Sequence, residues 1–92
     1  MKIKLQGFAS DRSVLLNGVL LDPKKSQKIR NHSPDGFNWG YGGSGPAQLA
    51  LAIYLELYGS QDKFPESYQD FKFREIGALP IGKDFDVEIE LL

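Results

Sequence analysis

Apolar and polar residues alternate at both ends of the chain, which predicts a β-strand at each end. Near the start, Ile3 and Leu5 alternate with polar residues, a period of two that is typical of a strand with one buried face. The segment 84–92 repeats this pattern, so we expect a final strand there. Its apolar side consists of Phe85, Val87, Ile89 and Leu91, and its acidic side of Asp86, Glu88 and Glu90.

A short apolar run, Ser13–Leu21, is interrupted only by Asn17 and Gly18. Both residue types tolerate the positive φ angles of a type I′ turn, so this pair between apolar runs predicts a β-hairpin. We expect the hairpin to pair with the first strand and to end at Asp22-Pro23, where the proline cannot continue a ladder.

Two helices are expected in the second half. The segment from Ala47 to Tyr58 contains only two polar residues, so a helix starting at Pro46 and ending at Gly59 would be buried on nearly all sides. A second helix is predicted over 65–76, ahead of Gly77 and Pro80. Its apolar residues recur at helical spacing, as Phe64, Tyr68 and Phe71.

Residues 22–45 show no periodicity, and we expect a long loop there. Its aromatic residues Phe37, Trp39 and Tyr41 alternate, which indicates order and is compatible with a short strand. These elements together predict one α+β domain over residues 1–92. A small antiparallel sheet, made of the N-terminal hairpin strands and the C-terminal strand, would pack against two helices.

Composition narrows the classes of function. The net charge of −1 argues against binding a long nucleic acid, since such domains are normally basic. The absence of cysteine excludes disulfides, thiolate metal sites and a cysteine nucleophile, and it suits the cytoplasm. No signal peptide is visible, and the longest apolar stretch, near 49–57, is too short to span a membrane. We expect no metal and no cofactor.

The most unusual segment is the glycine-rich stretch 39–46, with four glycines in six residues directly before the buried helix. Free amides and the dipole at a helix N-terminus attract phosphate or carboxylate, and glycines let a ligand approach the backbone. The segment matches neither the P-loop nor the dinucleotide-binding fingerprint. The other interpretation is structural, in which the glycines let the loop pack tightly over the helix.

His32 is the only histidine, and its ordinary pKa makes it the natural acid or base near neutral pH. It is therefore the candidate catalytic residue, for example in phosphoester cleavage. The surrounding residues 32–36 also have the composition of a turn, in which Ser33 and Asp35 bond to nearby amides.

The run from Arg30 to Ala50, RNHSPDGFNWGYGGSGPAQLA, resembles the signature of domain of unknown function 6166, a family of small bacterial, archaeal and phage proteins. The hairpin upstream and the segment 68–72, YQDFK, fit the same family, so the likeness covers residues 14–80. The likeness implies that these motifs form one unit and that a phage or mobile-element origin fits. It implies no activity.

We therefore expect a binding module that holds an anionic, nucleotide-derived small molecule at the glycine-rich loop, with a phage counter-defence role as one setting. A domain that binds or inhibits a host protein through the aromatic loop and the hairpin edge is the alternative, and a phosphoesterase using His32 is another. The sequence leaves the oligomeric state open. The candidate ligand-binding residues are Arg30, His32, Ser33, Asp35, Trp39, Tyr41, Gly42, Gly43, Ser44, Gly45 and Gln48.

Overall fold

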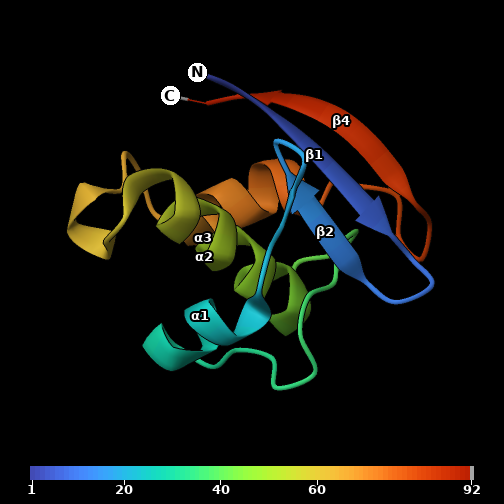
Figure 1. The fold of residues 1–92 in the computed structure, drawn as a ribbon, viewed down its shortest axis with the longest axis horizontal. Helices are drawn as coiled ribbons and strands as arrows, with labels where there is room; N and C mark the ends of the chain where they lie inside the picture. Colours follow the sequence, from blue (N-terminus) through green and yellow to red (C-terminus); the bar gives the residue numbers. More distant parts are fainter. Residues whose placement is uncertain (92) are drawn as a thin grey trace.

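A computed structural model describes residues 1–91 as four strands and several helical segments (Figure 1). The strands are β1 (Lys2–Phe8), β2 (Ser13–Leu16), β3 (Val19–Leu20) and β4 (Phe85–Glu90). The α-helices are α1 (Pro23–Ile29), α2 (Ser44–Tyr58) and α3 (Tyr68–Phe71), with a 3-10 turn at Gln61–Lys63 and a π-helical turn at Lys72–Ile76.

The strands form one antiparallel sheet in the order β3-β2-β1-β4. The hairpin turn is the expected one, because Asn17 and Gly18 have φ angles of 50° and 82°. The two ends of the chain lie side by side, with Lys2 opposite Glu90 in the ladder between β1 and β4. In β4 the residues of the apolar side are buried or half-buried and the carboxylates are exposed, as the alternation predicted.

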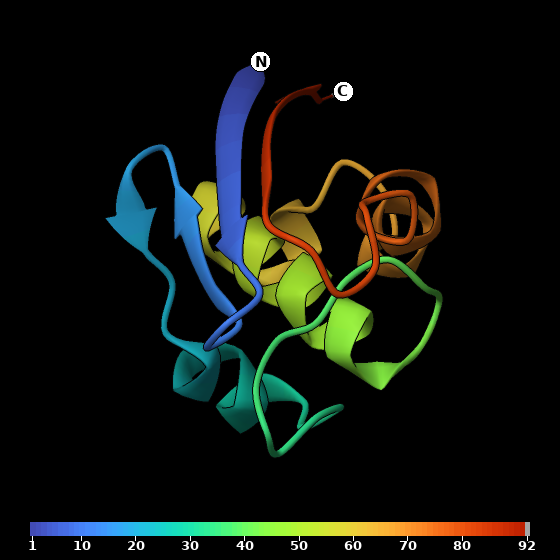
Figure 2. The same ribbon diagram turned by 90° about the vertical axis from the view of Figure 1, so that its right-hand side faces the viewer.

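Helix α2 runs through the centre of the molecule, and the helices gather on one face of the sheet (Figures 1 and 2). Every residue from Gly45 to Tyr54 is buried, which confirms the expected central helix. Tyr54 lies between aromatic rings, stacked on Phe71 at 4.6 Å between centroids and edge-on to Phe64. The domain is therefore α+β, as predicted.

The expected long loop was wrong in its first part, since Pro23–Ile29 forms α1. The Asp22 side chain accepts a hydrogen bond from the Lys24 amide and caps this helix, and Pro23 occupies its first turn. The pair that was expected only to end the hairpin therefore also starts a helix. No strand forms over 37–41 in the described chain.

The second predicted helix begins later than expected. Ser67 caps it by accepting from the Gln69 amide, so α3 starts at Tyr68 and residues 65–67 lie outside it. After Phe71 the helix widens into the π-helical turn, which ends at Ile76 as predicted. No helix within residues 1–91 is long and apolar enough to cross a membrane.

Candidate functional site

The segment 30–36 is fastened to the buried helix by one side chain, that of Gln48. Its Oε1 accepts from the amides of His32 at 2.7 Å and Ser33 at 3.0 Å. Its Nε2 donates to Ser26 Oγ at 2.8 Å and to the Arg30 carbonyl at 3.1 Å. Because the amide group is 0% exposed and bonded on both atoms, Gln48 holds the loop in place and has no capacity left for a ligand.

The imidazole of His32 is placed against α3. Its Nε2 lies 2.7 Å from the Tyr68 hydroxyl, and the two rings meet edge-on. Partial burial, together with the positive charges of Arg30 and Lys72, lowers the pKa of His32 below its usual value. His32 is therefore neutral at neutral pH and can accept a proton or donate one N–H.

Lys72 brings a buried cation to the glycine-rich loop. The residue is only 6% exposed, and its ammonium donates to the Gly42 carbonyl at 3.1 Å. The same ammonium lies 3.8 Å from the centre of the Phe73 ring. Within residues 1–91, no carboxylate forms an ion pair with Lys72. The contacts of this positive charge are thus a carbonyl and an aromatic ring.

The N-terminus of α2 adjoins this ammonium. Gly43 is the cap residue and provides no side-chain hydrogen bond, and the first backbone bond of the helix runs from the Ala47 amide to the Gly43 carbonyl. Pro46 has no N–H, and the Ser44 and Gly45 amides before it donate to no hydrogen bond within residues 1–91. Ser44 is exposed. The helix dipole and Lys72 therefore favour an anion at the same place.

Close packing around the loop explains why glycines occupy these positions. A Cβ on Gly43 would lie 2.5 Å from the Tyr41 ring, and one on Gly42 would lie 2.8 Å from the Phe73 ring. A Cβ on Gly40 would meet the Ile81 backbone at 2.5 Å. These contacts support the structural interpretation of the glycines. The anion-binding interpretation consequently depends on the cations and amides around the loop.

The remaining predicted site residues are divided between the core and other surfaces. Trp39 is 1% exposed, donates from Nε1 to the Lys83 carbonyl and packs edge-on against Phe85, so its ring offers no face to a ligand. Asp35 is exposed and lines a cavity toward the hairpin instead of the glycine-rich loop. Tyr41 is 40% exposed over the loop.

Among the predicted residues, Arg30 lies close enough to His32 for its charge to act there, and Lys72 connects His32 to the glycine-rich loop through its own charge and its bond to the Gly42 carbonyl. Sequence reasoning missed Tyr68 and Lys72 as members of the site. They are four residues apart, so they share one helix face, and this spacing was the signal available in the sequence. Both belong to the segment 68–72, which contacts the two other motifs through His32 and Gly42.

Comparison with known proteins identifies the family and no activity. No curated protein matches the chain, and no solved structure matches it. The profile of a family of unknown function, DUF6166, matches residues 6–90, which is nearly the whole chain. The match includes the hairpin, the loop held by Gln48, the glycine-rich segment and β4. The protein is therefore a member of the DUF6166 family.

Proposed function

We propose that this protein binds a small phosphate-bearing molecule, with a nucleotide as the first candidate, at the N-terminus of α2. The observation that supports this most is Lys72, a cation that is 94% buried and has no acidic partner within residues 1–91. Burying a charge is costly unless it is paired, and a bound phosphate would supply the counter-charge.

Several groups around Lys72 would contact the phosphate. The Ser44 and Gly45 amides and the Ser44 hydroxyl are donors at the helix N-terminus. Arg30 is exposed and close enough for its charge to act on His32, so it can serve as a second cation. His32 donates one N–H in its neutral form and strengthens the site when an anion favours its protonation.

Two exposed aromatic rings support a nucleotide in particular. Tyr41 is 40% exposed and Phe73 is 64% exposed, and their rings pack against the neighbouring glycines Gly43 and Gly42. A base could stack on either ring, an interaction worth about 1–3 kcal/mol. Trp39, one of the predicted ligand-binding residues, is replaced in this proposal by Phe73.

The proposal also includes the cellular role and compartment of the protein. A binder that holds a nucleotide-derived signal without turnover would suit a cytoplasmic protein, including one that a phage uses against host defence. The chain has no cysteine, which fits a reducing compartment. A catalytic role for His32 stays a prediction, and recovery of the bound compound, intact or cleaved, separates a binder from an enzyme.

A thermal-shift panel tests the proposal, using nucleoside monophosphates, cyclic nucleotides, ADP-ribose and inorganic phosphate. A ligand at 100 times its dissociation constant stabilises the fold by about 2.7 kcal/mol. For a domain of this size, that raises the melting temperature by roughly 10 °C or more. We expect one compound to give such a shift with the wild type.

Two variants that each remove one positive charge localise the effect. Lys72→Met removes the buried cation, and Lys28→Met removes an exposed one on α1. We expect Lys72→Met to abolish the shift and Lys28→Met to keep it. An unchanged shift in folded Lys72→Met, or a flat panel with the wild type, contradicts the proposal.

A further inference from the structure

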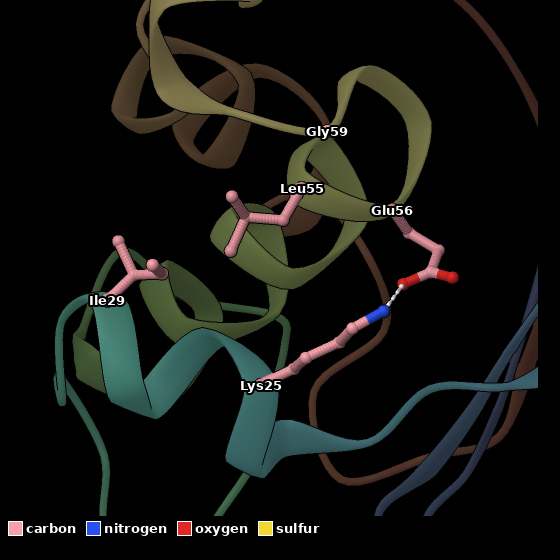
Figure 3. Close-up of a pocket in the computed structure, with 5 residues that line it drawn as sticks. All are labelled: Lys25, Ile29, Leu55, Glu56 and Gly59. Carbon is pink, nitrogen blue, oxygen red and sulfur yellow. Dashed lines mark hydrogen bonds and ion pairs between the residues drawn. The ribbon is translucent and has the colours of Figure 1, made fainter.

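A second surface lies at the other end of α2, where that helix meets α1 and the hairpin. One cavity of about 410 Å³ is lined by residues of α1 and of the last turn of α2, and Figure 3 shows Ile29 and Leu55 on its walls. A second cavity of about 240 Å³ lies between the hairpin and Leu57. Glu56 lines both cavities, so the two adjoin, and together they are called the groove below.

The groove is bordered by aliphatic side chains that the fold leaves open. Val19 is 66% exposed, Leu20 is 63% exposed and Ile29 is 52% exposed. Leu55 and Leu57 are half-buried beneath them. Single exposed aliphatic residues are ordinary, but several around one groove are typical of a contact surface.

Helix α1, which forms one wall of the larger cavity through Lys25 and Ile29, is positively charged. It carries the exposed lysines Lys24, Lys25 and Lys28 and no acidic residue. The acid in the groove is Glu56, and Lys25 Nζ lies 3.3 Å from its carboxylate (Figure 3). Both side chains of this pair are exposed, at 73% and 45%, so the pair contributes little and is readily exchanged for another carboxylate.

We propose that this groove binds an acidic amphipathic segment of a protein partner. Its apolar side chains would fill the two cavities, and its carboxylates would pair with Lys25 and Lys28. This is the helix-in-groove mode of recognition, with charge complementarity at the rim. The surface is separate from the anion site, since the 15 residues of α2 place its two ends about 22 Å apart.

Selection from a random peptide library displayed on phage, against the immobilised full chain, tests this inference. We expect the enriched peptides to carry Asp or Glu around Leu, Ile or Phe at helical spacing. Their affinity should fall about tenfold or more for Ile29→Gln, as for truncation of a central contact, and also for Lys28→Glu. Both positions are exposed, so these variants keep the fold. Lys83→Glu, at an exposed lysine in the turn before β4, is the matched control and should bind normally.

The inference is overturned if the enriched peptides are basic or uncharged, if they bind Ile29→Gln and Lys28→Glu as well as the wild type, or if no peptide is enriched. Light scattering on the free chain tests whether a second copy of the chain occupies the groove instead of a partner protein. A dimer that Ile29→Gln converts to a monomer would show that a second copy fills the groove, which also overturns the inference.

Discussion

Replacement of Gln48 by methionine should loosen the loop that carries His32. Methionine has a similar length and no amide, so Gln48→Met removes four hydrogen bonds and keeps most of the packing volume. Four groups each lose their hydrogen bond to Gln48: the amides of His32 and Ser33, the Arg30 carbonyl and the Ser26 hydroxyl.

The size of the effect follows from which of these groups water can reach. A typical hydrogen bond contributes about 0.5–1.5 kcal/mol, and a buried group left unpaired costs about 1–3 kcal/mol. The Ser26 hydroxyl still donates to the Pro23 carbonyl, and the Arg30 carbonyl belongs to an exposed residue. These two groups therefore contribute least to the loss of stability. The His32 amide keeps its 3.2 Å hydrogen bond to the Arg30 carbonyl, so the half-buried Ser33 amide is the group whose loss costs most.

We therefore expect the free energy of unfolding to fall by about 2–4 kcal/mol, which lowers the melting temperature by roughly 10–25 °C. Urea unfolding measures the first quantity. Amide hydrogen exchange adds a local readout, because the Ser33 amide should lose protection while the amides of β1 keep theirs.

Gln61→Met is the matched control, since Gln61 is exposed in the 3-10 turn. It should change the free energy of unfolding by no more than about 0.5 kcal/mol. If Gln48→Met also stays within about 1 kcal/mol of the wild type and the Ser33 amide remains protected, Gln48 is not what holds the loop.

Three further outcomes are expected. Gly40→Ala should destabilise the fold by about 2 kcal/mol or more in urea unfolding, because Gly40 has a φ of +88° and a Cβ would lie 2.5 Å from the Ile81 Cα; an effect below about 0.5 kcal/mol would contradict the packing of the loop. Tyr54→Phe should cost about 1.5–3 kcal/mol, since it removes the 2.7 Å hydrogen bond to the Glu66 carboxylate, and a neutral result would show that this bond contributes nothing. Because the pKa of His32 is lowered in the folded state, the stability it contributes is complete above its unfolded pKa and is lost as pH falls through the folded value. The melting temperature of the wild type should therefore fall more between pH 7.5 and 5 than that of His32→Gln, and parallel curves would refute the lowered pKa.

The sequence predicted the elements whose patterns are set by burial. The strands β1 and β4 alternate because one face of the sheet is covered, and α2 is apolar on nearly all sides because it is central. The hairpin was predictable because Asn17-Gly18 specifies its turn locally. In each case a pattern within a few neighbouring residues specifies the same element that the tertiary structure requires.

Helix α1 was missed because only one of its faces touches the core, and a run with Ile29 as its single aliphatic residue shows no period. Its signal was the cap at Asp22. Lys72 was missed as a site residue because a buried lysine is expected only where its charge is paired. Its position depends on a contact with Gly42, 30 residues away, which no local pattern reveals.

The most direct test of the proposed site is an NMR titration of the ¹⁵N-labelled protein with inorganic phosphate. We expect saturable shifts of the Ser44 and Gly45 amides together with a rise in the pKa of His32. Lys72→Met should lose these changes and Lys28→Met should retain them. Shifts spread over the exposed lysines of α1, or no saturable shift at the N-terminus of α2, would contradict anion binding there.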